Sequence, residues 1–589
     1  MKQPRTYAYP SFAQLAGPLR EPAPDYRVGY QQIGRRHTAR LRGRLLALAA
    51  VLFEAVFLVW LLWPSHYPDD TGSLAHVLGL AMVASVGVIE VLRLVNIVTL
   101  CLATINVRDP LPVRPADDTR VAFVTTWVPG KEPLAMVEAT LRAALKVRHT
   151  GTLDVWLLDE GNDLDARLLC ARLGVNHFSR NGVERWNQPT GPYRAKAKHG
   201  NYNAWLETAG QGYDVMIGVD TDHVPMPQMA ERMLGYFRDP DVAFVVGPQV
   251  YGNYDNFVTK AAESQQYLFH SVLQRAANRA QCPMFVGTNN AVRITALQQI
   301  GGLADSITED AATSLRWHAA RNPQTRRRWT SVYTPDVLAV GEGPRSWTDY
   351  FNQQYRWARG TDEVLVRQFP RTGSMGWRAR LQYGLLMSYY PSAALSWALG
   401  AVNISLYLLT GIGGVQVAAR TWLALYVNAA VLQVGIYFWN RRHNVSPHEP
   451  EGSSGVLGMF ISVLSAPVYL MALTDTLRRR ASAFVVTAKG DAASPDGWGT
   501  FRIQLRWAAW WALVLCAAVV LGHHHPAMYV WGLLALVVSL LPAVLWRLLP
   551  TAPPTGYGDA VPGSELIDLG LHPLSATPAV STAREEIHS

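Results

Sequence analysis

Long apolar runs alternate with polar stretches along this chain and divide it into segments that cross a membrane and segments that do not. Two runs come early, at about residues 45–63 and 74–104. Each is long enough to cross the ~30 Å hydrocarbon core of a bilayer as a helix of roughly 20 residues. Later apolar runs lie near residues 386–410, 420–439, 455–474, 505–522 and 527–549. The pattern therefore predicts an integral membrane protein.

The positions of the basic residues predict how these runs are oriented. Arginines cluster beside several runs, for example within 35–44 and at 478–480, whereas the link between the first two runs, PSHYPDDTGS, has no Lys or Arg. Because cytoplasmic loops carry an excess of Lys and Arg, we expect the N-terminus and the segment after residue 105 to face the cytoplasm. If all five later runs crossed, the arginines at 478–480 would lie outside. We therefore expect the run at 455–474 to lie in the membrane interface, which leaves six spans.

Residues 118–345 have the pattern of a soluble α/β domain. Short apolar stretches that read as strands alternate there with helix-like stretches, which predicts a mainly parallel sheet with crossover helices. In such sheets, ligands bind beyond the carboxyl ends of the strands. The predicted strands are 121–127, 153–159, 214–220 and 242–247.

The two patterns together predict an α/β domain inserted between α-helical transmembrane segments. The expected order is a cytoplasmic N-terminal segment (1–43), two transmembrane helices (44–105), a cytoplasmic domain (106–345), interfacial helices (346–385), two transmembrane helices (386–440), an interfacial helix and a loop (441–504), two transmembrane helices (505–550) and a disordered tail (551–589).

Composition and charge agree with a membrane protein. Of the 589 residues, 49% are apolar and 16% are charged, below the roughly 25% charged residues of soluble domains. The net charge of +9 could indicate a nucleic-acid partner, but the basic clusters lie beside the apolar runs, so we expect the lipid bilayer as partner and no nucleic acid. The four cysteines show no paired spacing, which argues against a disulfide framework or a zinc site. We expect no cleavable signal peptide, because the first 43 residues are polar.

Paired carboxylates follow the predicted strands of the soluble part. Asp159 closes the second strand, and Asp220 and Asp222, one residue apart, close the third. Two carboxylates placed where a strand gives way to a loop can converge on a divalent cation, and their hard oxygen ligands suit Mg²⁺ or Mn²⁺ with diphosphate oxygens. An Asp-x-Asp also occurs in many solvated surface loops, so that interpretation stays open.

Two later groups of residues could act on an acceptor and a leaving group. The run TED at 308–310 opens a helix-like stretch; it could be a helix cap with favourably placed acids, or it could contain a general base for an acceptor hydroxyl. The run QQYRW at 353–357 could form a basic amphipathic helix on the membrane surface. It could equally provide an Arg that neutralises a diphosphate and a Trp that stacks on a sugar ring.

Taken together and in this order, the four groups resemble the signature of processive family-two glycosyltransferases, above all bacterial cellulose synthase. The resemblance covers roughly residues 44–550, and no cyclic-di-GMP-binding module is expected after the last span. It departs from the family's pattern at 128–133, where VPGKEP replaces Pro-Thr-Tyr-Asn-Glu, and at Val286, where a Cys is often found. Further similar runs are KHGNYN at 198–203, DTDHVP at 220–225, GTN at 287–289 and FVVTAKG at 484–490.

The resemblance implies a glycosyltransferase-A-type, nucleotide-sugar-binding domain and a role for each matched residue. It implies that Asp310 is the catalytic base, next to Glu309 and Thr308, and that Asp220 and Asp222 hold Mg²⁺ or Mn²⁺. The residues implied to bind the nucleotide sugar are Thr125, Glu132, Asp159, Lys198, Asp220, Gln353, Arg356, Thr487 and Lys489. Those implied to border the acceptor sugar are His223, Phe285, Gly287, Thr288 and Trp357.

The resemblance further implies an inverting transferase of the plasma membrane that polymerises UDP-glucose into a β-glucan, cellulose or a related polymer, and passes it outward. The TED run favours a glucan, since hyaluronan-type synthases more often carry Gly-Asp-Asp there. The alternatives are a polysaccharide synthase that uses UDP-N-acetylglucosamine, a non-processive transferase with a lipid acceptor, and a transporter with a soluble regulatory domain. Accessory proteins of the cell envelope are considered as further partners.

Three charged residues lie inside the first two apolar runs. They are Glu54, Glu90 and Arg93. Charged side chains within a membrane are costly and tend to be functional. Glu90 and Arg93 are three residues apart and could pair on one face of a helix, beside a channel for the glycan.

Overall fold

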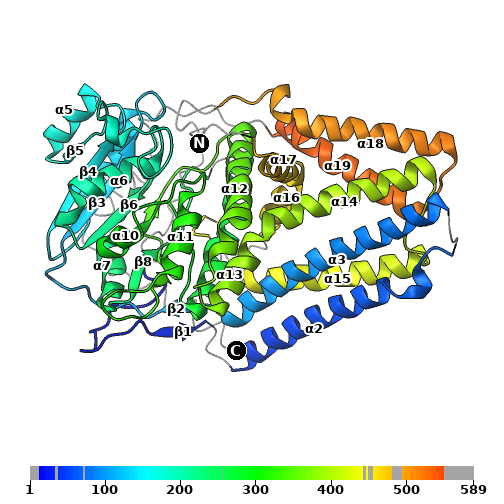
Figure 1. Ribbon diagram of the computed structural model, residues 1–589, viewed down its shortest axis with the longest axis horizontal. Coiled ribbons are helices and arrows are strands. Elements are labelled where there is room, and N and C mark those ends of the chain that lie inside the picture. Colours follow the sequence, from blue (N-terminus) through cyan, green and yellow to red (C-terminus); the bar gives the residue numbers. More distant parts are fainter. Residues whose placement is uncertain are drawn as a thin grey trace, which may run out of the picture.

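The structure is a computed structural model that describes residues 12–33, 37–69, 73–254, 256–441, 446–448, 455–480 and 494–549. It consists of an α/β domain at one end and a bundle of long helices at the other (Figure 1). The predicted disordered tail and the FVVTAKG run, with Thr487 and Lys489, lie outside the described residues.

A seven-stranded sheet forms the centre of the α/β domain. Its order is β10-β8-β9-β6-β3-β4-β5, and every pairing is parallel except those of β9 with β6 and β8. The predicted fold class, a mainly parallel sheet, is therefore confirmed. The strands are β3 (Val121–Trp127), β4 (Leu153–Asp159), β5 (Asn176–Phe178), β6 (Val215–Val219), β8 (Val242–Val246), β9 (Asn290–Arg293) and β10 (Thr330–Tyr333).

Helices cover both faces of this sheet. Alternate side chains of β3 enter two separate apolar clusters, with Phe123 packing in the cluster of Leu141 and Val124 packing in that of Trp205. Because neighbouring side chains of a strand point to opposite faces, a strand buried on both faces reads as a continuous apolar run. The helices of the domain are α4 (Leu134–Ala144), α5 (Leu164–Leu173), α6 (Lys198–Thr208), α7 (Met229–Leu234), α10 (Ile294–Gln299) and α11 (Glu309–Ala319).

The segment before the first membrane helix packs against the α/β domain. Its strand β1 (Tyr30–Gln32) pairs antiparallel with β2 (Arg108–Pro110), which follows the second membrane helix. The Arg27 guanidinium contacts the carboxylates of Asp239 and Asp241 at 2.7 and 2.5 Å. The N-terminal segment and the domain therefore lie on the same side of the bundle.

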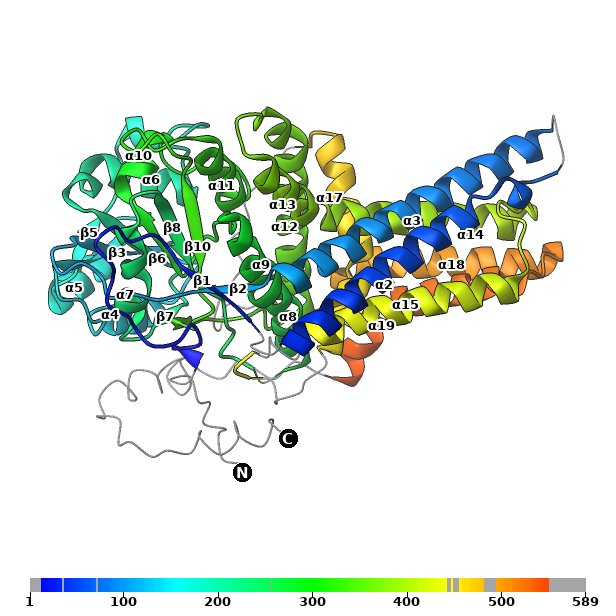
Figure 2. The same cartoon turned by 90° about the horizontal axis from the view of Figure 1, so that it is seen from below.

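The bundle contains six helices, among the described residues, that are long and apolar enough to cross a membrane. Their outer side chains, such as Leu52 and Val520, are exposed, as expected for surfaces that face lipid. Together they identify a multi-pass membrane protein, and they run side by side away from the sheet (Figure 2). They are α2 (His37–Leu61), α3 (Leu74–Asn106), α14 (Tyr389–Thr410), α15 (Ala419–Arg441), α18 (Arg502–Leu521) and α19 (Pro526–Leu548).

The run predicted to form one interfacial helix at 455–474 forms two. Helices α16 (Val456–Leu464) and α17 (Ala466–Leu477) meet at an angle of 49°, and the bent pair would pass as a seventh span if counted as one. Gly458 of α16 lies against helix α8 (Phe257–Leu268): a Cβ there would be 2.6 Å from the backbone N of Gln265. Only glycine permits this close approach of two helix backbones.

Helix α12 (Trp347–Arg367) lies between the domain and the bundle (Figure 1) and contains the QQYRW run. It packs against α17, and α13 (Trp377–Met387) then leads to α14. A short antiparallel pair, β7 (Val224–Pro225) and β11 (Ala339–Val340), holds the loop before α12 next to the loop after β6. This pairing brings residues more than 100 positions apart to the candidate site.

Candidate active site

The paired aspartates lie just beyond the carboxyl end of β6, where a parallel sheet places its ligands. Lys198, the first residue of α6, pairs with the Asp220 carboxylate and donates a hydrogen bond to the Gly287 carbonyl at 2.7 Å. The Asp220 N–H donates to the Thr288 hydroxyl at 2.9 Å. Burial lowers the pKa of Lys198, but the Asp220 carboxylate outweighs it and raises that pKa above its ordinary value. The lysine therefore stays charged beside the aspartate.

A second carboxylate and a histidine lie next to Asp220. Ligand atoms of Asp220, Asp222 and His223 all lie within 4.8 Å of one another, so the group could hold a metal ion. The Asp222 carboxylate accepts the Glu342 N–H at 3.1 Å, which fixes its orientation. Gly341 leaves room for the imidazole, because a Cβ there would lie 2.5 Å from the His223 ring.

The donor atoms of this group fit a divalent cation. His223 is 3% exposed; its Nδ1 lies 3.4 Å from Asp222 Oδ1, but neither ring nitrogen makes a hydrogen bond among the described residues. A buried imidazole without a hydrogen bond is costly unless a ligand satisfies it. Carboxylate oxygens and a neutral imidazole are a donor set that Mn²⁺ accepts, while Mg²⁺ prefers the oxygens alone.

The acid pair at the start of α11 faces the same site. A Cβ on Gly287 would lie 3.4 Å from Glu309 Oε1, 3.6 Å from Lys198 Nζ and 4.0 Å from Asp310 Oδ2, so these groups surround one backbone position. Burial, with a contribution from the Glu309 carboxylate, raises the pKa of Asp310 to about 7. A carboxylate with a pKa near neutrality is well suited to accept a proton from a hydroxyl.

The structure supports the helix-cap interpretation of the TED run only in part. Thr308 occupies the N-cap position of α11, but its buried hydroxyl caps no N–H within the described chain. The side chain instead packs against α12, where a Cβ on Gly360 would lie 2.3 Å from Thr308 Cγ2. The run thus joins the acid pair to the helix that carries the QQYRW run.

Helix α12 brings its arginine to the carboxylates. Burial lowers the pKa of Arg356, while the neighbouring carboxylates of Glu309, Asp220 and Asp310 act in the opposite direction. Gln353 Nε2 lies 3.5 Å from the Tyr251 hydroxyl, and the Trp357 side chain lines the large cavity described below. The sequence-predicted residues of both loops and of α12 therefore converge on one place.

Four residues predicted to bind the nucleotide sugar or the acceptor make contacts within the protein instead. Two of them, Asp159 and Glu132, order loops. The Asp159 carboxylate is fully buried and accepts the N–H groups of Gly161 and Asp163 at 2.8 and 2.6 Å, so it orders its own loop. Glu132 accepts the Val128 N–H at 3.2 Å and the Thr221 hydroxyl at 3.1 Å.

Phe285 and Thr125 point into the protein interior. Phe285 packs in the apolar core, with ring centroids 5.2 Å from those of Phe244 and Trp317. Thr125 is fully buried within β3. Their predicted contacts with acceptor and nucleotide stay predictions.

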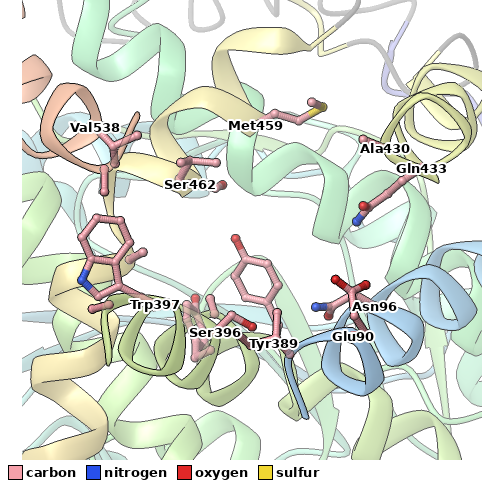
Figure 3. Close-up of a pocket in the computed structure, with 18 of the residues that line it drawn as sticks. Glu90, Asn96, Tyr389, Ser396, Trp397, Ala430, Gln433, Met459, Ser462 and Val538 are labelled. Carbon is pink, nitrogen blue, oxygen red and sulfur yellow. The ribbon is translucent and has the colours of Figure 1, made fainter. Parts of the chain in front are cut away.

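A cavity of about 1210 Å³ extends from the candidate site into the bundle (Figure 3). Thr308, Asp310 and Trp357 line it on the domain side, and Gly411 and His525 line it at the far ends of the helices. Helices α3, α14, α15, α16, α18 and α19 all contribute to its wall. Asp310 therefore opens directly onto a cavity that extends into the membrane bundle.

A mainly parallel sheet with acidic residues at its strand ends, joined to a bundle of candidate membrane helices, is the architecture that the motifs predicted. The profile of the family "Glycosyl transferase family group 2" matches residues 216–440. Over this part the chain is similar to family-two glycosyltransferases, and it is similar to bacterial cellulose synthase catalytic subunits. The resemblance predicted from the motifs is confirmed at this level.

Two curated relatives illustrate the relationship. The chain is 29% identical over 275 residues to "Cellulose synthase catalytic subunit [UDP-forming]" of Xanthomonas axonopodis pv. citri (strain 306), covering 45% of this chain and 35% of the relative. It is 28% identical over 363 residues to "Cellulose synthase 2" of Novacetimonas hansenii, covering 59% of this chain and 21% of the relative. The matches thus span about a third of the first relative and about a fifth of the second.

The solved structures that resemble this chain have lower sequence identity than these relatives. The mannosyltransferase PcManGT from Pyrobaculum calidifontis, in complex with GDP-Man and Mn²⁺, is 14% identical with a TM-score of 0.47 and covers 68% of this chain and all of its own (100%). Glucosyl-3-phosphoglycerate synthase from Mycobacterium tuberculosis is 14% identical with a TM-score of 0.30, over 42% of this chain and 80% of its own. The fold assignment therefore rests on the sheet order and the helices described above.

The sequence missed several residues that shape the site. Gly341 and Glu342 lie about 120 positions after the paired aspartates and reach them only through the β7–β11 pairing. His270, in the π-helical turn Phe269–Gln274, is buried and lines the cavity. No local pattern marks these positions, because their role depends on contacts between distant segments.

Proposed function

We propose that this protein is a processive, inverting glycosyltransferase that adds glucose from UDP-glucose to a growing β-glucan and passes the polymer through its own helices. The observation that carries the proposal is the direct opening of the acid pair, at Asp310, onto the cavity through the bundle. A product released into that cavity stays next to the base that activates its end, so repeated addition needs no rebinding.

The transfer step follows from the placement of the charges. Asp310 takes the proton from an acceptor hydroxyl, whose oxygen attacks the anomeric carbon of the donor sugar from the side opposite the diphosphate. The bond between that carbon and the diphosphate breaks, and UDP leaves with the electron pair. One base and one displacement invert the anomeric configuration.

Cationic groups are in place for the departing diphosphate. Lys198 pairs with Asp220, and Arg356 lies near the same carboxylates, so both can move to phosphate oxygens when UDP-glucose enters. Asp220 and Asp222 would hold Mg²⁺ or Mn²⁺, which when bound neutralises the leaving diphosphate. In this proposal His223 and Trp357 border the acceptor sugar at the mouth of the cavity.

The cavity wall supports a polymer path over transfer of single sugars to a lipid. Three lining tryptophans, Trp397, Trp511 and Trp531, have no partner for their indole N–H in the described structure, and neither does Oδ1 of Asn403. Sugar hydroxyls can satisfy such groups, and sugar rings stack on aromatic faces.

The orientation in the membrane belongs to the same proposal. Basic clusters beside the spans favour a cytoplasmic catalytic domain, at about 106–345, where nucleotide sugars are found. The N-terminal segment packs on this domain, so it shares that side. The polymer would then emerge on the outer side, near Gly411 and His525.

The decisive experiment combines donor choice with product size. Purified full-length protein in lipid nanodiscs is incubated with UDP-glucose or UDP-N-acetylglucosamine and Mg²⁺ or Mn²⁺, and both UDP release and product length are measured. We expect UDP-glucose to give long polymers digestible by β-glucanases. Turnover with UDP-N-acetylglucosamine alone would overturn the glucan assignment, and products carrying a single added sugar would overturn processivity.

A further inference from the structure

Three charged side chains lie together inside the membrane bundle, where α2, α3 and α15 meet. Arg93 of α3 lies between two carboxylates: its Nη1 is 3.3 Å from Glu90 Oε2, and its Nε is 3.5 Å from Glu54 Oε1. The guanidinium carbon is 4.4 Å from the ring centroid of Tyr426. We call Glu54, Glu90 and Arg93 the membrane triad.

The membrane triad is not a closed structural ion pair. Glu54 is fully buried, yet in the part of the chain that the structure describes neither of its carboxylate oxygens accepts a hydrogen bond. The Nη2 of Arg93 likewise donates none there. A buried ion pair stabilises a fold only when its geometry is close and its remaining polar atoms are satisfied, and charges kept within a membrane tend to be functional.

One member of the triad faces the cavity. Figure 3 shows Glu90 on the α3 side of the cavity, near Asn96, with Trp397 on the opposite side. The acidic side chains that line the cavity are Glu90 and Asp310, and no Lys or Arg is found among the described lining residues. The wall therefore presents carboxylates and no exposed cation to the polymer.

The membrane triad contains two carboxylates for one guanidinium. With both carboxylates ionised it carries one net negative charge, which repels a passing anion. A neutral hexose, in contrast, presents hydroxyls that donate hydrogen bonds to a carboxylate.

We propose that Glu90 makes the cavity selective for glycans without carboxylate groups, an inference that rests on the proposed function. A uronate unit would bring its own carboxylate beside Glu90 in a medium of low dielectric constant, where like charges repel strongly. The polymer would then consist of uncharged or amino-bearing hexose units. Glu90 is the residue that sets this class, and Arg93 and Glu54 position it.

The test compares two oligosaccharides that differ only in charge. Full-length protein in lipid nanodiscs is titrated with a β-1,4-linked glucose hexamer and with the same hexamer oxidised to uronate units, and binding is measured by calorimetry. We expect the wild type to bind the neutral hexamer at least about tenfold more tightly, because one charge repulsion at low dielectric is removed. We expect Glu90→Gln to lose most of this preference. An unchanged preference in Glu90→Gln would overturn the proposal.

Two further variants separate charge from folding. Val91→Gln places the same amide at the next position of α3, where the side chain is 46% exposed on the outer surface of the bundle, and we expect it to keep the wild-type preference. Glu90→Asp keeps the charge and should also keep the preference. Loss of the preference in Glu90→Asp would contradict the role of the carboxylate even if Glu90→Gln failed to fold.

UDP release on the same samples separates this inference from the function on which it rests. A wild type that releases no UDP from any donor would overturn the proposed function. A wild type that releases UDP from UDP-glucose but binds both hexamers equally would leave the transfer activity intact and overturn the selectivity alone.

Discussion

The α/β domain and the membrane bundle hold their buried charges in different ways. In the domain, Arg232 binds the Asp336 carboxylate through two nitrogens at 2.9 and 2.6 Å. Arg180 binds Glu160 through two nitrogens at 3.0 and 2.7 Å. In the bundle, Arg93 is shared between Glu90 and Glu54 at 3.3 and 3.5 Å.

This difference in contact length separates charges that stabilise the fold from charges that are available to a ligand. A short ion pair held by two hydrogen bonds satisfies both partners, and removal of one partner leaves the other buried without compensation. The loosely held carboxylates instead face a space that a ligand can enter, as Glu90 does in the cavity and Asp310 does at its domain end. Tight pairs should therefore govern stability, and the open carboxylates should govern activity.

The largest effect should come from Asp310→Asn. Loss of the proposed general base is expected to lower the rate of UDP release by about 10²–10⁴-fold, without lowering the thermal midpoint, since the amide keeps the size and shape of the side chain. Initial rates and melting curves of the purified variant check both. Glu138→Gln, at a surface ion pair with Arg142, is the control and should keep full activity. A melting point lowered along with the rate would show that Asp310 serves the fold.

The reverse pattern is expected for Arg232→Met. It leaves the Asp336 carboxylate buried without its partner and should lower the free energy of unfolding by about 3–5 kcal/mol. Denaturant titration of the purified protein measures this loss. The double variant Arg232→Met with Asp336→Leu should recover much of the stability, and a double variant as unstable as the single one would contradict the pairing argument.

Removal of divalent cations should lower the rate by about a hundredfold, because the leaving diphosphate then lacks its neutralising charge. The measurement is UDP release after treatment with EDTA and again after addition of Mn²⁺ or Mg²⁺. Asp222→Asn should need a higher metal concentration for half-maximal rate. Full activity in EDTA would exclude the metal role of the paired aspartates.

The pH dependence of the reaction rate should follow the titration of the Asp310 carboxyl. Burial raises the pKa of Asp310 to about 7, so below this pH the carboxyl is protonated and cannot accept the acceptor's proton. The rate should therefore rise through pH 7 and fall about tenfold for each pH unit below it. A rate that stays constant from pH 5 to pH 8 would rule out Asp310 as the titrating group.

The smallest effect is expected for Trp397→Phe in the cavity. Phenylalanine keeps an aromatic face but removes the indole N–H, which has no partner within the described residues. We expect a change of a few-fold in product length, the size of one modest hydrogen bond, and an unchanged melting point. Gel filtration of the polymer measures the product length. A lowered melting point of the variant would instead show that Trp397 stabilises the fold.

The sequence predicted the sheet best where strands are long and apolar. β3, β4, β6 and β8 were predicted close to their observed bounds, because strands buried on both faces read as continuous apolar runs. β9 was not predicted: its residues, NAVR, are few and begin and end with polar side chains. It forms by pairing antiparallel between two strands that are distant in sequence.

The motifs predicted which segments meet at the site but not where each side chain points. Phe285 belongs to a matched segment, yet its ring lies in the core, since the backbone around Gly287 faces the acid pair instead. The break between α16 and α17 does have a sequence signal. Pro467 stands in the first turn of α17, where its missing N–H costs nothing, and a new helix therefore starts there.

Helix α12 has a consequence for inhibition. It carries Arg356 and Trp357 at the site, while the hydroxyl of Tyr355 on the same helix donates to Asp475 of α17 at 2.9 Å. A small molecule wedged between α12 and α17 would displace the arginine without occupying the nucleotide pocket. Such a compound would act non-competitively with respect to the sugar donor, so high donor concentrations would not relieve the inhibition.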